Sequence, residues 1–469
     1  EFDAPAARGG QSMKDLATRS YWLGLDAYEP GPPLNGDMDA DVAIIGGGFT
    51  GLWTAYHLLK ADPGLTVVVL EGSAVGYGAS GRNGGFAMPL VHRSLQSLVD
   101  NLGHERARAI HHSAEEAVET LQRVCAEEKI DADLMPNGLL TVSNTPLQDE
   151  HIQREAKVAS ELGIEGIRLL DRDEIQARVH SETFRSALEE DVCVLVNPAR
   201  LVRGLKEAVI RAGGRVFEQT AMTKLSESDE GVVVQTPGGS IRAGRALLAA
   251  NAYSVSFPEL SDRVTPFYSY ILLSEPLTDE QWERIGWKGR EGMEDRRTFL
   301  HYFRPTIDGR IMWAGRDAPY RPDGPDPKYD RDDRVFKRLE KTFEWTFPQL
   351  SDLKFEYSWG GPVGVTATFL PAAGWLKGNR IAYAFGYNGH GVAITCLLGK
   401  CVRDLILERD TDLTRLALVG RKPPSLGPRI VRDRIVQAQS DFQLRQDDAG
   451  RELKPSLFVR ATQKIFGGF

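Results

Sequence analysis

The sequence lacks long uninterrupted apolar runs. None of its apolar stretches approaches the roughly 20 residues that a membrane-spanning helix requires. The apolar core of a signal peptide is also missing near the first residue. We therefore expect no membrane span and a cytoplasmic location.

The sequence also lacks an excess of basic residues. Lysine and arginine number 57, against 65 aspartate and glutamate residues, so the formal net charge is −8 at pH 7. A nucleic-acid-binding domain would instead carry a basic surface and a high isoelectric point. We expect no nucleic-acid partner.

Cysteine is scarce. The four cysteines, Cys125, Cys193, Cys396 and Cys401, are scattered and form no C-x-x-C pair. This spacing is not typical of a disulfide framework or a zinc site. We expect reduced, mostly buried thiols and no bound metal ion.

Glycine, in contrast, is concentrated in residues 41–72, DVAIIGGGFTGLWTAYHLLKADPGLTVVVLEG. The β-branched run Val42–Ile45 predicts a buried strand of a parallel sheet, and apolar residues recur at helical spacing from Phe49. Between them Gly46, Gly48 and Gly51 fit G-x-G-x-x-G. The first glycine permits a tight turn, the second lets backbone approach a pyrophosphate, and the third lets helix pack on strand. The helix N-terminus would favour phosphate.

A second strand and an acidic residue complete this unit. Val67–Leu70 predicts the strand, and Glu71 ends it, 20 residues after Gly51. An acid at this place can accept hydrogen bonds from a ribose diol. The segment therefore predicts an adenine-dinucleotide site that includes Gly46, Gly48, Phe49, Thr50, Gly51 and Glu71.

Two further glycine-rich segments indicate which dinucleotide is bound. Residues 76–85, GYGASGRNGG, predict a compact polar loop able to lie along an extended cofactor, or else a flexible surface turn. A nicotinamide-dependent dehydrogenase would normally enter another helix here. Residues 379–406, NRIAYAFGYNGHGVAITCLLGKCVRDLI, predict a strand, a glycine turn and a helix opening near Gly389. That helix would direct its positive end at a ligand.

In this order and at these separations, the three segments resemble FAD-dependent oxidoreductases of the D-amino-acid oxidase and glycine/sarcosine oxidase type. The sequences VVVLE, GASGRNGG and WGGPVGVT most resemble the γ-glutamylputrescine oxidase branch and the aminophosphonate oxidoreductases near it. The resemblance covers about residues 20–430. It implies FAD as cofactor and hydride transfer from a neutral amine to flavin N5. Water would then hydrolyse the resulting imine to a carbonyl compound.

The length and composition fit such an enzyme. A chain of 469 residues is too long for one small core, and 42% hydrophobic with 26% charged residues is ordinary for a globular protein. We expect an α/β fold, α+β overall, with a discontinuous Rossmann-like FAD-binding domain formed by residues 41–95, 185–258 and 355–415. A substrate domain with an antiparallel sheet and helices would comprise residues 96–184 and 259–354. The remainder would be an N-terminal arm, 1–40, and a charged C-terminal helical tail, 416–469.

The expected FAD contacts extend beyond the first unit. They include Gly78, Ala79, Ser80, Arg82, Asn83, Gly84, Gly85, Met222, Gly361, Tyr387, Asn388, Gly389, His390, Gly391 and Val392. Amides at the helix start near Gly389 would stabilise negative charge on the reduced flavin. His390 would either add a donor or cap the helix, and Arg82 and Asn83 would either contact flavin or hold their loop closed.

Three departures from the family narrow the expected chemistry. Pro362 stands about where oxidases of free α-amino acids place an arginine that grips the carboxylate. The segment WGGPVGVTATFLP has no cysteine to tether flavin, so we expect noncovalent FAD. Met312 or Trp313 replaces the lysine with which sarcosine oxidases promote reaction with oxygen, which leaves open oxygen or another electron acceptor.

Few side chains are expected to act in catalysis. Candidates on the strands that would roof the flavin are Tyr268, Tyr270, His301, Tyr302, Arg304, Arg316 and Trp359. As catalytic or substrate contacts we select Arg82, His301, Tyr302, Arg316, Trp359 and His390. Arg304 and Arg316 would supply a cation for an anionic group distant from the amine.

The sequence thus predicts an FAD-dependent amine oxidase or dehydrogenase. Its substrate would be a primary or secondary amine with a remote anionic group, such as an aminophosphonate or a γ-glutamyl amine. An α-amino-acid or N-methyl amino-acid oxidase and a non-catalytic flavoprotein subunit are the alternatives. The polar tail favours a surface or subunit contact, which leaves a homo-oligomer open.

Overall fold

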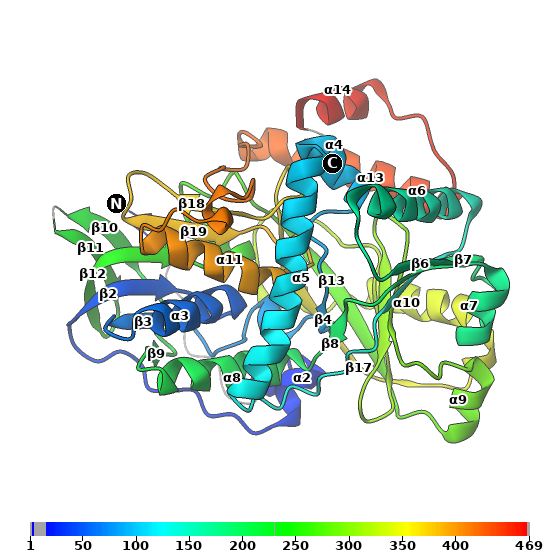
Figure 1. The fold of residues 1–469 in the computed structure, drawn as a ribbon, viewed down its shortest axis with the longest axis horizontal. Helices are drawn as coiled ribbons and strands as arrows, with labels where there is room; N and C mark the ends of the chain where they lie inside the picture. The colour runs from blue at the N-terminus through cyan, green and yellow to red at the C-terminus, as the bar shows by residue number, and fades with distance from the viewer. Residues whose placement is uncertain (1, 4–15, 229, 467–469) are drawn as a thin grey trace.

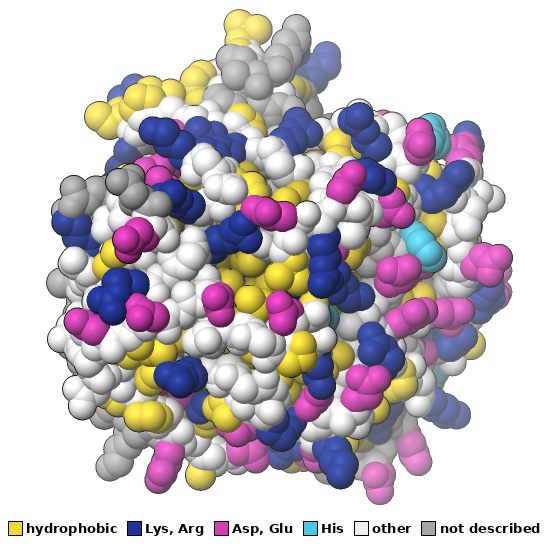
Figure 2. Space-filling view, turned by 60° about the vertical axis from the view of Figure 1, so that its left-hand side comes forward, with side chains coloured by type: hydrophobic (Ala, Val, Ile, Leu, Met, Phe, Trp, Pro, Cys, Tyr) yellow, Lys and Arg dark blue, Asp and Glu magenta, His cyan; other side chains and the backbone are white. Residues whose placement is uncertain are grey.

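The computed structural model describes residues 2–3, 16–228 and 230–466. It is a mixed α/β structure with two large sheets (Figure 1). None of the described helices combines the length and the apolar composition that crossing a bilayer would need. On the face shown in Figure 2, acidic and basic side chains are interspersed.

The first sheet carries the predicted dinucleotide unit. Its strands run in the order β1-β10-β11-β12-β2-β3-β9, and β19 pairs with both β12 and β18. Their bounds are β1 (Phe2–Asp3), β2 (Met38–Ile45), β3 (Val67–Leu70), β9 (Arg215–Phe217), β10 (Lys224–Ser228), β11 (Gly231–Thr236), β12 (Gly239–Leu248), β18 (Ala372–Trp375) and β19 (Ile381–Phe385).

The central strands β2, β3, β9, β12 and β19 are parallel to their neighbours within that group. They are covered on both faces, which explains why β3 is apolar at every position. Val42 and Ile44 pack with helices, whereas Ala43 and Ile45 pack with residues of β10–β12.

The second sheet has the strand order β17-β13-β16-β15-β14-β5-β7-β6. All its pairs are antiparallel except β5 with β14. The bounds are β5 (Leu139–Ser143), β6 (Ile167–Leu170), β7 (Ser186–Glu190), β13 (Thr265–Ser274), β14 (Gly292–Asp295), β15 (His301–Pro305), β16 (Ile311–Gly315) and β17 (Phe355–Val365). The domain boundaries stay a prediction, although β7 and β17 pair in this sheet and not with the strands of the FAD unit.

The helices are α2 (Tyr21–Leu25), α3 (Phe49–Ala61), α4 (Leu95–Leu102), α5 (His104–Glu127), α6 (Pro146–Leu162), α7 (Arg172–Arg178), α8 (Pro198–Arg211), α9 (Asp279–Ile285), α10 (Asp333–Thr346), α11 (Gly391–Ile406), α12 (Asp412–Arg415), α13 (Arg429–Ala449) and α14 (Leu457–Phe466). Short 3-10 turns are η1 (Ala79–Gly81), η2 (Asn251–Ser256), η3 (Pro327–Tyr329) and η4 (Pro348–Leu350), and β4 (Phe86–Ala87) pairs with β8 (Val194–Leu195). Helices α3, α5, α8 and α11 share one core with the first sheet, and α10 packs on the second.

Local sequence patterns located the main elements well. The strand at 42–45, the helix from Phe49 and the strand Val67–Leu70 are confirmed. The helix expected near Gly389 begins at Gly391, because Asn388 and Gly389 have φ of 54° and 97° and form the preceding turn.

The C-terminal tail is not only a surface appendage. Helix α13 packs against the second sheet region, where Asp447 accepts hydrogen bonds from the amides of Thr298 and Phe299 at 2.9 Å each. Arg316 forms an ion pair with Asp448 on the same helix. These contacts place α13 at the site described next, whereas its role in oligomerisation stays a prediction.

Candidate functional site

One cavity of about 1450 Å³ is lined by residues of both sheets, the first-sheet helices α3 and α11, and α13. Ordinary small-molecule pockets measure roughly 300–1,000 Å³, so this cavity has room for a large cofactor together with a substrate. It runs from the glycine turn after β2 to an outer region walled by α4, α6, the β14–β15 loop and α13.

The inner end of the cavity is formed by the start of α3. Gly46 has a φ of 119°, and a Cβ there would lie 2.6 Å from the Ala249 carbonyl oxygen, so the turn requires glycine. A Cβ on Gly51 would lie 2.0 Å from the Gly46 oxygen. Gly51 therefore serves helix packing and does not line the cavity, as the third glycine of the motif should.

Gly48 faces a different neighbour. A Cβ at this position would lie 2.9 Å from Ser80 Oγ, and Gly48 itself lines the cavity. Within the described residues, the amides of Thr50 and Gly51 in the first turn of α3 have no hydrogen-bond acceptor. A phosphate group placed beside this helix start would supply one.

Glu71 lies at the carboxyl end of β3, in the cavity wall. Its Oε2 accepts a hydrogen bond from the Gly47 amide and its Oε1 from the Ser73 amide, each at 2.9 Å. Burial raises the pKa of Glu71 to about 7. A carboxylate keeps further lone pairs beside these two bonds, so it can still accept from a ribose hydroxyl.

The loop of residues 76–85 closes on itself through side chains. Asn83 donates to the Ala79 oxygen at 3.0 Å and accepts from the Gly85 amide at 2.8 Å. Arg82 pairs with Asp330 at 3.0 Å and donates to the Gly360 oxygen at 3.3 Å. Both side chains hold the loop and also border the cavity, so a holding role and a cofactor contact are compatible.

The start of α11 forms the opposite wall. Its first amides, those of Gly391, Val392 and Ala393, have no acceptor among the described residues. Asn388 Oδ1 accepts from the Thr366 amide at 3.0 Å, which fixes the preceding turn. This second helix start fits the pyrimidine edge of a flavin, where negative charge accumulates on reduction.

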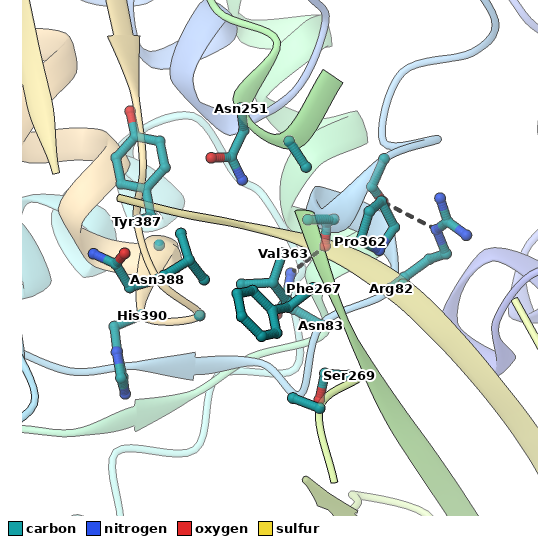
Figure 3. Close-up of a pocket in the computed structure, with 18 of the residues that line it drawn as sticks. Arg82, Asn83, Asn251, Phe267, Ser269, Pro362, Val363, Tyr387, Asn388 and His390 are labelled. Atoms are coloured by element: carbon teal, nitrogen blue, oxygen red, sulfur yellow. Dashed lines mark hydrogen bonds between the residues drawn. The ribbon is translucent and has the colours of Figure 1, made fainter. Parts of the chain in front are cut away.

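His390 and Tyr387 complete this wall. The His390 side chain does not cap α11, and burial lowers its pKa to about 4, so its imidazole is neutral at neutral pH. The Thr50 hydroxyl donates to Tyr387 Oη at 2.8 Å, which ties the two helix starts together. Figure 3 shows Tyr387, Asn388 and His390 on one side of the pocket and Arg82 with Pro362 on the other.

On β13, which forms part of the cavity roof, the residues that face the cavity alternate with the tyrosines that were expected to do so. Phe267, Ser269 and Ile271 line the cavity. Tyr268 and Tyr270 lie on the other face, where their hydroxyls donate to backbone oxygens of Asp326 and Tyr329. Tyr268 and Tyr270 therefore do not reach the pocket.

Neighbouring strands divide the predicted candidates in the same way. Tyr302 lines the cavity, and its hydroxyl lies 2.9 Å from Ser269 Oγ. His301, next to it, lies on the far face between Asp295 at 2.9 Å and Thr342 at 2.9 Å. Trp359 is buried and donates to the Arg82 backbone oxygen at 2.9 Å. His301 and Trp359 thus lie outside the cavity wall.

The two arginines proposed for a remote anion have different positions. Arg304 is buried and donates to the backbone oxygens of Val196, Gly85 and Gly84 at 2.8, 3.2 and 3.3 Å. It supports the glycine loop and is not in the cavity wall, so it is not available to substrate. Arg316 lines the cavity but is paired with Asp448.

Most predicted cofactor residues do meet in this cavity. Those in its wall are Gly46, Gly48, Phe49, Thr50, Glu71, Gly78, Ala79, Ser80, Arg82, Asn83, Gly84, Gly85, Met222, Gly361, Tyr387, Asn388, Gly389, His390, Gly391 and Val392. Gly51 is the exception, for the packing reason given above. The orphan amides, the glycine cradle and Glu71 together fit FAD.

Sequence reasoning missed the outer region of the cavity. Arg93, Phe369, Gln443 and Asp447 line it, together with Phe267 nearer the flavin wall. These residues come from segments far apart in the chain and share no motif, so no local pattern could have identified them. Pro362 lines the cavity as expected, whereas Met312 and Trp313 are buried in β16.

Cysteines and metal-binding groups play no part in the cavity wall. All four cysteines are buried and unpaired, and none lines the cavity. Among the described residues, no three histidine, cysteine or carboxylate side chains are grouped to hold a metal ion.

Comparison with known proteins agrees with this geometry. Residues 41–405 match the family model "DAO: FAD dependent oxidoreductase". The chain is 33% identical over 396 residues to gamma-glutamylputrescine oxidoreductase of Escherichia coli (strain K12), covering 84% of this chain and 90% of that protein. It is 22% identical over 377 residues to glycine oxidase of Bacillus licheniformis, covering 78% of this chain and 93% of that protein.

A solved structure shows the same fold. Glycine oxidase from Geobacillus kaustophilus aligns with a TM-score of 0.67 at 19% identity, covering 82% of this chain and 99% of that chain. The family match spans most of the chain and includes both helix starts that face the cavity. The chain therefore belongs to the DAO family of FAD-dependent oxidoreductases and is an enzyme that uses FAD.

Proposed function

We propose that the protein oxidises the C–N bond of an amine that carries an anionic group remote from the reacting carbon. The product is an imine, which water hydrolyses to a carbonyl compound. Bound FAD supplies the acceptor for the two electrons and the hydride. The protein's own contribution is binding, orientation and charge stabilisation.

The observation that carries this proposal is Pro362 in the cavity wall. Pro362 lines the cavity beside Gly361 and Val363 and has no donor on its side chain or its backbone nitrogen. A carboxylate on the reacting carbon would need a bidentate cation there, and loss of such a buried partner costs several kcal/mol, about 2–5. Free α-amino acids therefore fit this position poorly.

The surrounding wall suits an uncharged amine. Phe267 and Val363 give the wall near Pro362 an apolar surface, and Ser269 adds a hydroxyl (Figure 3). Ile271 and the hydroxyl of Tyr302, 2.9 Å from Ser269 Oγ, also line the cavity. Exclusion of water by apolar side chains favours the neutral amine as the reacting form. No dedicated acid or base is required of these residues.

The outer region leaves space for the rest of an elongated substrate. It is lined by polar residues of α6, the β14–β15 loop and α13, such as Gln148, Thr298 and Gln443. A γ-glutamyl amine has its carboxylate many bonds from the reacting carbon, and 2-aminoethylphosphonate has its phosphonate on the next carbon, so both carry an anionic group elsewhere than on the reacting carbon. The similarity to an enzyme named gamma-glutamylputrescine oxidoreductase supports this substrate class.

Two finer points are part of the proposal. FAD is bound noncovalently, supported by the absence of cysteine from the cavity wall among the described residues. Met312 and Trp313 stand where sarcosine oxidases have the lysine that promotes reaction with oxygen. The electron acceptor of this protein is therefore either oxygen or another oxidant. An α-amino-acid oxidase is the alternative, in which Arg82 or Arg316 would bind the carboxylate.

Product analysis tests the substrate class. The FAD-loaded protein is incubated with γ-glutamylputrescine, 2-aminoethylphosphonate, glycine, sarcosine and D-alanine, and carbonyl products are trapped with a hydrazine and weighed by mass spectrometry. We expect aldehydes with the anionic group retained at a distance. Formation only of α-keto acids or glyoxylate would establish the amino-acid alternative.

A further inference from the structure

Unlike the other arginines of the described cavity wall that are shielded from solvent, Arg93 has no carboxylate partner. Arg82, Arg296, Arg297 and Arg316 pair with Asp330, Glu155, Asp295 and Asp448, respectively. Within the described residues, no carboxylate oxygen lies within 4.0 Å of the Arg93 guanidinium. Arg154 also lacks such a pair, but it is exposed at the rim.

The Arg93 side chain is held in place by an aromatic ring. Its guanidinium carbon lies 3.6 Å from the centroid of the Phe369 ring. This stacking covers one face of the guanidinium plane and fixes its direction, while the N–H groups remain at the edge. Phe369 thereby presents a preorganised fork that matches the two oxygens of a carboxylate or phosphonate.

The unpaired charge of the half-buried Arg93 guanidinium is costly. Burial lowers the pKa of Arg93 to about 10, with only partial compensation from Asp447 on α13. A charge removed from water without a partner is unfavourable unless a ligand pairs with it. Within the described residues, Arg93 is therefore a half-buried cation of the cavity wall with which no carboxylate pairs.

The position of Arg93 is suitable for the far end of a substrate. Its backbone oxygen accepts from Arg296 at 3.1 Å, which anchors it to the β14–β15 loop. Phe369 follows the turn at Thr366, whose amide donates to Asn388 at 3.0 Å. Arg93 thus lies between the wall formed by the α11 start and the outer region closed by α13.

We infer that Arg93 binds the remote anionic group of the substrate, a carboxylate or a phosphonate, and so determines specificity. This assignment rests on the proposed function and names the residue that replaces the missing cation at Pro362. It transfers to Arg93 the role that the sequence suggested for Arg304, which is occupied by backbone oxygens.

The test uses Arg93→Gln and Arg93→Lys, with Arg154→Gln as a control that removes a nearby exposed charge. Anaerobic flavin reduction is followed in a stopped-flow instrument with two matched pairs: γ-glutamylputrescine against N-acetylputrescine, and 2-aminoethylphosphonate against ethylamine. The first pair tests recognition of a carboxylate, and the second tests recognition of a phosphonate. FAD content and the visible spectrum are recorded for each variant.

For Arg93→Gln we expect the apparent Kd of at least one anionic substrate to rise by about 10- to 100-fold, the loss expected for a charge-assisted hydrogen bond. For Arg93→Gln, the limiting rate of flavin reduction, the apparent Kd of N-acetylputrescine and of ethylamine, and the flavin spectrum should change little. The apparent Kd values of Arg154→Gln should stay close to those of the wild type, and those of Arg93→Lys should lie between the wild type and Arg93→Gln. Equal losses for charged and neutral amines, or a shifted flavin spectrum, would show that Arg93 supports the fold or FAD instead. An unchanged apparent Kd of both anionic substrates in Arg93→Gln, or a selective loss of their binding only in Arg154→Gln, would also overturn the assignment. If none of the amines reduces the flavin of the wild-type protein, the proposed function itself is refuted.

Discussion

Gly48→Val should abolish tight FAD binding while leaving the chain folded. The new side chain begins 2.9 Å from Ser80 Oγ, a terminal atom that can rotate, and then extends into the space beside the first turn of α3. It would therefore block access to the amides of Thr50 and Gly51, which have no acceptor within the described residues.

The expected loss follows from these two amides. A hydrogen bond to a charged group contributes about 1.5–3 kcal/mol, so two of them contribute about 3–6 kcal/mol. This corresponds to a Kd for FAD weaker by about 10²- to 10⁴-fold. Gly51→Ala should behave differently, because its Cβ would lie 2.0 Å from a backbone oxygen and would disturb the packing of α3 on β2.

Titration of the apoprotein with FAD, followed by quenching of flavin fluorescence, measures this change. Circular dichroism and thermal unfolding without FAD report on the fold, and Gly64→Val in an exposed turn serves as the control. A folded Gly48→Val protein that binds FAD with wild-type affinity would refute the placement of the pyrophosphate at this helix.

Two further changes test the supporting structure. Arg304→Met should destabilise the chain by about 2–4 kcal/mol in denaturant unfolding, because it leaves carbonyl oxygens of the glycine loop without their buried donor; a loss below about 0.5 kcal/mol would contradict this role. His92 has its pKa lowered by burial from 6.5 to about 4, so its neutral form favours folding at neutral pH and this contribution is lost as pH falls from about 6.5 towards 4. At pH 5 the loss is about 2 kcal/mol, and His92→Gln should flatten the pH dependence of unfolding by that amount; an equally steep profile would contradict the assignment.

The sequence was most informative where structure is local. The β2–α3–β3 unit could be predicted because strand, glycine turn, helix and acid are contiguous, and each has a stated geometric reason. The second helix start at α11 was found in the same way.

The prediction failed where the direction of a side chain depends on tertiary packing. Strand β13 is covered on both faces, so its alternation gave no indication of whether Tyr268 or Phe267 faces the cavity. For the arginines, nothing in the sequence indicated which side chains line the cavity. Arg304 and Arg93 differ only in tertiary contacts, backbone oxygens in one case and the Phe369 ring in the other.

The role of α13 could not be derived locally either. Its charged composition is typical of a surface helix, and tertiary contacts, among them those of Asp447 and Asp448 with the second sheet region, bring it to the cavity. The family match ends at residue 405, so α13 lies beyond the part of the chain that the family model matches.

The central claim is tested most directly by anaerobic reduction of the bound flavin with equal concentrations of remote-anion amines and α-amino acids. We predict saturable bleaching by γ-glutamylputrescine or 2-aminoethylphosphonate that is at least tenfold more efficient than bleaching by glycine, sarcosine or D-alanine, as expected for loss of one charge-assisted contact. Faster, saturable reduction by the α-amino acids would contradict the account and would mean that Pro362 does not exclude a carboxylate from the reacting carbon.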